Sequence, residues 1–83
     1  MRVELKVLTR NESTALPRIL RLVARQSCLL KKLILQPHEE EGIIEILLLL
    51  DCPESPMRLI KLLQKQISVT EVQLLKEEIS QAI

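Results

Sequence analysis

The 83-residue sequence contains no phenylalanine, tyrosine or tryptophan, and this absence constrains both its core and its ligands. Without aromatic rings it lacks the stacking surfaces with which proteins bind RNA and single-stranded DNA. Leucine, isoleucine and valine must therefore fill the core. Because a chain of this length buries only about 60% of its unfolded surface, we expect a partner to extend this thin core, in a homodimer or a larger assembly.

An excess of charge and a long apolar run are also missing. Twelve lysines and arginines stand against eleven aspartates and glutamates, for a net charge of +1. That balance gives no basic footprint for nucleic acid. The longest apolar stretch, IIEILLLL at residues 43–50, is far shorter than the ~20 residues of a membrane span and is typical of a buried strand. We therefore predict neither a nucleic-acid nor a membrane partner.

Glycine and histidine each occur once, which excludes several kinds of site. A glycine-rich phosphate loop is absent, and His38 has no second histidine with which to complete a zinc site. The glutamates that follow His38 are typical of a solvated hairpin tip. No Ser–His or Cys–His pairing has a context for nucleophilic catalysis. We predict no catalytic residue, no metal and no cofactor.

Only two cysteines occur, Cys28 and Cys52, and their spacing is not that of a metal site. The N-terminus shows no secretory signal, which favours a reducing, cytoplasmic compartment. We therefore expect two buried or half-buried free thiols.

The hydrophobic periodicity predicts six elements: strand, helix, two strands joined by a hairpin, helix and strand, over residues 1–9, 14–26, 28–37, 43–51, 57–66 and 68–79. This order is typical of the split βαβ arrangement. We predict one domain, residues 1–83, with an α+β, ferredoxin-like fold. A four-stranded antiparallel sheet would carry both helices on one face.

Two helix starts can be located from capping residues. Thr14 is the expected N-cap of the first helix, and Pro17 then falls at the third helical position, where its missing N–H was unpaired anyway. In the second helix, Ser55 is the expected cap and Pro56 the first helical residue.

Three segments resemble the ACT domain of acetolactate synthase small subunits. NESTALPRI, VARQSCLLKKL and LLQKQISVTEV resemble the family's N-x-P-G-V-L-x-R-I, FARRGFNIESL and QLNKLIDVIKV. The matching residues are Asn11, Leu16, Arg18, Ile19, Ala24, Arg25, Leu33, Leu63, Lys65, Ile67, Val69 and Val72. Ser13 and Thr14 stand where the family usually has Pro-Gly. This departure and the short length are most similar to the small subunit of the second isozyme.

The resemblance implies a cytoplasmic, non-catalytic subunit of branched-chain amino-acid biosynthesis. Such a subunit binds and activates a thiamine-diphosphate-dependent large subunit. The alternative is a free-standing ACT domain that senses an amino acid at a dimer interface.

In ACT regulators, the resemblance implies, an amino-acid effector sits where the first loop and first helix meet a neighbouring protomer. The corresponding residues are Asn11, Thr14, Ala15 and Leu16. Here Thr14 replaces a glycine that would admit a carboxylate, and Pro17 removes an N–H donor. We expect weak or absent binding of branched-chain amino acids.

Two surfaces are candidates for protein contact. On the third strand, Ile43, Leu47 and Leu49 point away from the helices, and an exposed aliphatic patch usually marks an interface. Leu8, Leu33 and Leu35 join this patch or not, depending on register. The patch serves self-association, for instance by edge pairing of the second strands, or a catalytic subunit. Arg18 and Arg25, with Arg21 between them, form a solvated helix face or dock on an acidic partner.

Overall fold

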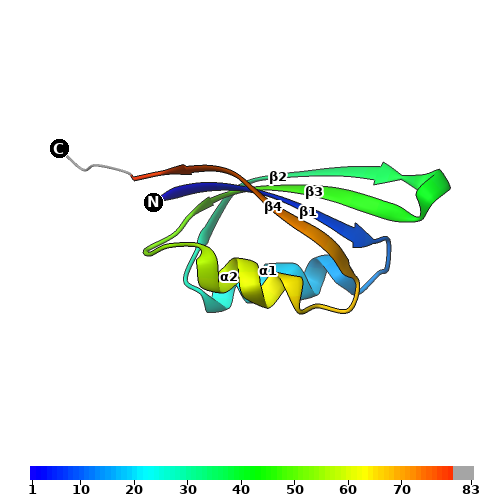
Figure 1. The fold of residues 1–83 in the computed structure, drawn as a ribbon, viewed down its shortest axis with the longest axis horizontal. Helices are drawn as coiled ribbons and strands as arrows, with labels where there is room; N and C mark the ends of the chain where they lie inside the picture. Colours follow the sequence, from blue (N-terminus) through cyan, green and yellow to red (C-terminus); the bar gives the residue numbers. More distant parts are fainter. Residues whose placement is uncertain (80–83) are drawn as a thin grey trace.

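The computed structural model describes residues 1–79, and its elements follow the order expected from the sequence. They are β1 (Arg2–Arg10), α1 (Ala15–Arg25), β2 (Leu29–His38), the 3₁₀ turn η1 (Glu39–Glu41), β3 (Ile43–Asp51), α2 (Met57–Gln64) and β4 (Val69–Glu78). The strands form one antiparallel sheet in the order β2-β3-β1-β4. Both helices lie on the same face of that sheet (Figure 1). The ferredoxin-like fold class is confirmed.

The core lies between the helices and one face of the sheet. Strand alternation supplies its sheet side, because every second residue of β1 from Val3 to Thr9 and of β3 from Ile46 to Leu50 is buried. The helices close it with Ile19, Val23, Leu59 and Leu63, all at most 3% exposed. Fully burying each such side chain contributes about 1.5–3 kcal/mol. The core is therefore aliphatic throughout, as the absence of aromatic residues requires.

The helix starts differ in detail from those expected. Thr14 occupies the N-cap position of α1, but its side chain makes no capping hydrogen bond. Pro17 lies at the third helical position, as predicted. In α2, Pro56 is the N-cap and not the first helical residue, although the helix begins at Met57, as the predicted range 57–66 has it, and ends two residues earlier, at Gln64. Ser55 still serves the helix start, since its Oγ accepts a hydrogen bond from the Met57 N–H at 3.4 Å.

The end of α1 depends on a serine in left-handed backbone geometry. Ser27 has φ +60°, which is uncommon for a residue with a side chain. Its N–H donates to the Ala24 carbonyl at 3.0 Å, and the Cys28 N–H donates to the Val23 carbonyl at 3.2 Å. This pair of bonds is the Schellman motif that turns the chain from α1 into β2.

Replacing Ser27 with glycine is expected to stabilise the fold. Glycine adopts positive φ at little steric cost, whereas other L-residues lose about 1–2 kcal/mol there. Since glycine also gains entropy in the unfolded chain, we expect a net increase of about 0.5–1 kcal/mol in the free energy of unfolding. Urea denaturation of Ser27→Gly measures this. Ser27→Ala is the control and should give no gain, so equal stabilisation by alanine would contradict the backbone explanation.

A disulfide joins Cys28 and Cys52. The antiparallel register of β2 and β3 ends on the pair Leu29 and Asp51. Cys28 directly precedes β2 and Cys52 directly follows β3, so the two cysteines lie opposite each other, with 4.3 Å between their Cα atoms. The expectation of buried side chains is confirmed, at 8% and 2% exposure. The expectation of free thiols is wrong, because hairpin register brings together two residues whose separation of 24 suggests no pairing. The disulfide therefore gives no support to the reducing compartment from which free thiols were expected.

Candidate binding surfaces

The face of the sheet opposite the helices is partly apolar and has no covering layer among residues 1–79 (Figure 1). We call it the open face. The register confirms that Ile43, Leu47 and Leu49 belong to it, because their neighbours Ile46 and Leu48 point into the core. Leu47 and Leu49 are half-buried by the strands around them.

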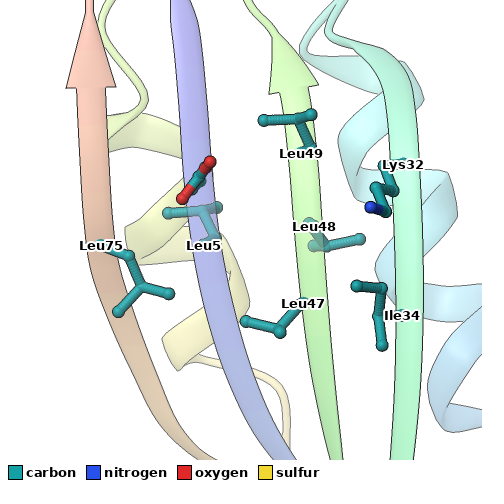
Figure 2. A pocket seen from close by; sticks show the side chains of 8 residues that line it. Leu5, Lys32, Ile34, Leu47, Leu48, Leu49 and Leu75 are labelled. Carbon is teal, nitrogen blue, oxygen red and sulfur yellow. The ribbon is translucent and has the colours of Figure 1, made fainter.

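A hollow of about 280 Å³ lies on the open face, where Lys32 and Ile34 of β2 stand beside Leu47 and Leu49 of β3 (Figure 2). Glu4 and Leu75 line it from the other side. Leu75 reaches this position because the pairing of β4 with β1 slips by one residue beside it. Ile34 and Leu75 are 42% and 49% exposed, so apolar side chains on this face reach both edge strands, β2 and β4.

The pairing of β2 decides which additional leucines belong to the open face. Leu8 does, since it lies opposite Glu45, whereas Leu33 and Leu35 lie opposite Leu48 and Ile46 and so face the helix side. The assignment of Leu33 and Leu35 to this patch is therefore wrong. An edge-pairing role for either residue remains a prediction. Ile34 and Leu75 are patch residues that sequence reasoning missed, although the alternation of β2 could have identified Ile34 once the register was fixed.

Charged side chains are distributed unevenly on the open face. Lys6 pairs with Glu45, with 3.1 Å between Nζ and Oε1. Glu4 and Lys32, in contrast, form no ion pair within residues 1–79. They flank Leu49 on either side, in one row of the register.

The first loop brings together the residues assigned to an effector site but leaves little of their chemistry available. The Asn11 N–H donates to the Gly42 carbonyl at 3.0 Å, and the Ala15 N–H donates to Glu12 at 3.1 Å. The Ala15 side chain is 2% exposed, and Leu16 packs against the core. Of these four residues, the exposed Asn11 and Thr14 side chains and the N–H groups of Thr14 and Leu16 have no hydrogen-bond partner within residues 1–79 and remain for a ligand.

Valine, leucine and isoleucine are therefore expected to bind this loop weakly or not at all. The loss of one hydrogen bond to a charged group costs about 1.5–3 kcal/mol, or roughly tenfold or more in affinity. Calorimetry with each amino acid on the wild-type chain tests this expectation. Thr14→Gly with Pro17→Ala restores both missing features and is the variant in which binding should appear. Micromolar, stoichiometric binding to the wild type that is abolished at Asn11 would show that the site is open.

The helices carry a cluster of positive charge on their solvent side. Arg18, Arg21 and Arg25 of α1 are exposed and form no ion pair among the described residues. Arg58 and Lys61 of α2, with Lys65 just after it, repeat the i, i+3, i+7 spacing of the α1 arginines. This second set was visible in the sequence but was not predicted to form a charged surface. We call the combined set the basic helical layer: Arg18, Arg21, Arg25, Arg58, Lys61 and Lys65.

The basic helical layer makes the molecule electrically asymmetric. Residues 15–25 and 57–65 hold six of the twelve basic residues and none of the eleven acidic ones. The rest of the chain therefore holds six basic and eleven acidic residues. The net charge of +1 hides this separation, which is why composition alone gave no sign of a charged surface.

Other kinds of site find no support in residues 1–79. No group of three or more histidine, cysteine or acidic side chains there could hold a metal ion. In the same part of the chain, no helix has the length and apolar character needed to cross a membrane.

Comparison with known proteins identifies the fold. No family model matches the sequence. A search of curated proteins found no match either. Among solved structures, the ACT domain of GTP pyrophosphokinase from Chlorobium tepidum is similar, with a TM-score of 0.76 and 14% identity over 90% of this chain and 97% of that one. The chain therefore has the fold of an ACT domain.

Two further structures share this fold. The C-terminal domain of the MgtC protein from Mycobacterium tuberculosis aligns with a TM-score of 0.71 and 22% identity, over 99% of this chain and 93% of that domain. A formyltetrahydrofolate deformylase from Pseudomonas putida aligns with a TM-score of 0.77 and 11% identity, over 93% of this chain but only 29% of the enzyme. At these identities the likeness concerns the fold alone.

Proposed function

We propose that this chain is a non-catalytic regulatory subunit that activates the large subunit of an acetolactate synthase by direct contact. It would act in the cytoplasm, in branched-chain amino-acid biosynthesis. The proposal combines the ACT fold with the resemblance of three segments to acetolactate synthase small subunits. It requires a surface that binds the large subunit.

The observation that carries the proposal is the location of the charged residues shared with those small subunits. Shared apolar residues such as Ile19 and Leu63 are buried, so the fold alone accounts for them. The three shared charged residues, Arg18, Arg25 and Lys65, are all exposed and all belong to the basic helical layer. Packing does not require a charge at these positions, which favours a role in binding.

The chemistry of the basic helical layer indicates an acidic partner surface. The absence of aromatic residues removes base stacking, which argues against nucleic acid as that partner. Arginine guanidinium groups bind carboxylates in a bidentate manner and retain their charge at any physiological pH. Contacts of this kind raise the association rate and are screened by salt over about 8–10 Å.

Co-elution tests the proposal. The chain is mixed with a purified thiamine-diphosphate-dependent acetolactate synthase large subunit and applied to a gel-filtration column at 50 mM and at 500 mM NaCl. We expect a complex at low salt that weakens at high salt. Absence of a complex at both salt concentrations, at micromolar protein, would contradict the proposal.

The alternative function is a free-standing amino-acid sensor. One observation favours it: the Leu16 N–H at the start of α1 has no hydrogen-bond partner within residues 1–79, and such a donor suits a carboxylate. The two functions are separated by thermal melting with amino acids in the absence of a large subunit. A ligand-dependent rise in the melting temperature supports the sensor, and no change with any amino acid argues against it.

A further inference from the structure

Two oppositely charged side chains flank the apolar centre of the open face, and neither has a partner within residues 1–79. In the register, Glu4 of β1, Leu49 of β3 and Lys32 of β2 lie side by side in one row. Adjacent strands are about 4.8 Å apart, so Leu49 separates the two charges by two strand spacings. All three side chains line the same hollow. The charges are therefore placed for a contact outside the chain.

We propose that a second copy of this chain covers the open face, sheet against sheet, with a two-fold axis parallel to β3 above Leu47 and Leu49 (Figure 2). Such an axis exchanges the strands on either side of β3, so β1 of one copy lies over β2 of the other. Positions along the strands are unchanged. Glu4 of each copy then faces Lys32 of the other, and two reciprocal ion pairs enclose a centre of leucines. A closed dimer requires this kind of self-complementarity.

Other symmetric arrangements of the same face satisfy these charges less well. An axis perpendicular to the strands would place Glu4 over Lys6 of the second copy, which competes with the existing Lys6–Glu45 contact at 3.1 Å, and would leave Lys32 without a carboxylate. The axis along β3 instead places Lys6, which already has Glu45 as its partner, over Ile34. An axis between β1 and β3 would place Lys32 over Lys76, because Lys76 pairs with Glu4 in the register of β4. With the axis along β3, both copies of Glu45 approach it, each neutralised by its own Lys6.

The apolar content of the open face supports the same occupant. Packed sheets lie about 10 Å apart with their side chains interdigitated. With the axis along β3, Leu47 and Leu49 of each copy lie against the same residues of the other and extend the thin core, while β4 with Leu75 lies beyond the edge of the second sheet. The result is a four-layer dimer, helices–sheet–sheet–helices.

This arrangement has a consequence that rests on the proposed function. The two basic helical layers would form the two outer faces of the dimer, because the helices lie on the opposite side of each sheet from the contact (Figure 1). The open face would then serve self-association, and the basic helical layer would remain free for the large subunit. One dimer could bind two large subunits.

The experiment is a charge swap measured by sedimentation equilibrium on the chain alone. We expect the wild type to dimerise at micromolar concentration, and Glu4→Lys and Lys32→Glu each to weaken the dimer at least tenfold, since each creates two like-charge contacts. The double variant, Glu4→Lys with Lys32→Glu, should return to within about threefold of the wild type. Lys61→Glu, which changes the charge of the helix side by the same amount, should have no effect.

Circular dichroism accompanies each measurement to establish that the variants fold, and Glu4→Gln and Lys32→Gln serve as milder substitutions. A wild type that stays monomeric at 100 µM would overturn the proposal. A dimer whose affinity is unchanged by both single substitutions, as expected for edge pairing of β2, would also overturn it. So would a double variant that folds but does not regain the dimerisation affinity of the wild type. Because no large subunit is present, failure here leaves the proposed function standing, and success does not depend on it.

Discussion

Loss of the Cys28–Cys52 disulfide is expected to lower the free energy of unfolding by about 3 kcal/mol. The bond closes a loop with a sequence separation of 24 residues, and the chain-entropy relation for a loop of this length gives about 3 kcal/mol. A domain of this size has a total stability of about 4–12 kcal/mol. The bond therefore accounts for a large fraction of that stability, and its removal should lower the melting temperature by roughly 12–24 °C.

Thermal melting with and without dithiothreitol measures this effect. Cys28→Ala with Cys52→Ala is the control, because it should melt at a similarly reduced temperature and should not respond to the reductant. An unchanged wild-type melting temperature under full reduction, with both thiols titratable, would contradict the expected contribution. Such a result would mean that the two buried cysteine side chains stabilise this end of the hairpin by packing alone, without the bond.

Reversal of the α1 charges, with Arg18, Arg21 and Arg25 each replaced by glutamate, is expected to abolish activation of the large subunit at low salt. The change turns three cations on the proposed partner-binding surface into three anions. Like-charge contacts in a protein interface cost several kcal/mol, and the attraction that speeds association is lost as well. The fold should survive, because all three side chains are exposed and form no ion pair in residues 1–79.

Single substitutions give the matched comparison for this prediction. Arg18→Glu should weaken activation at 50 mM NaCl more than at 500 mM, since salt screens the interaction. Lys31→Glu changes the net charge equally but lies on β2, outside the basic helical layer, and should have little effect. If Arg18→Glu leaves activation unchanged at both salt concentrations, α1 is a solvated helix face and the partner binds elsewhere.

Local sequence pattern predicted those parts of the fold that depend on one element at a time. The alternation of β3 placed Ile46, Leu48 and Leu50 in the core and Leu47 and Leu49 outside it, and the structure agrees. The bounds of β3 were predicted to the residue, because a polar hairpin tip and a Cys-Pro pair delimit the apolar run. The element order alone was sufficient for the fold class.

Features that depend on how two strands pair could not be predicted in the same way. The disulfide and the faces of Leu33 and Leu35 all follow from the register of β2 against β3, which includes a one-residue irregularity between Leu30 and Lys32. The place of Leu75 in the hollow depends on a similar slip in β4. A one-residue shift moves every following side chain to the other face, and the alternation of a single strand does not show where such a shift occurs.

The basic helical layer was missed for a different reason. The spacing of Arg58, Lys61 and Lys65 could be read from the sequence as easily as that of the α1 arginines. Only the arrangement of both helices on one side of the sheet shows that the two sets belong to one surface (Figure 1). Net charge describes a whole chain, whereas binding depends on the charge of one face.

The central claim is that this chain regulates an acetolactate synthase by contact and performs no chemistry of its own. Its most direct test is acetolactate formation from pyruvate by a thiamine-diphosphate-loaded large subunit, measured as the purified chain is titrated in at low salt. The account predicts no turnover by the chain alone and a saturable rise in the activity of the large subunit. A flat titration with a large subunit from the same cells, or turnover by the isolated chain, would contradict it.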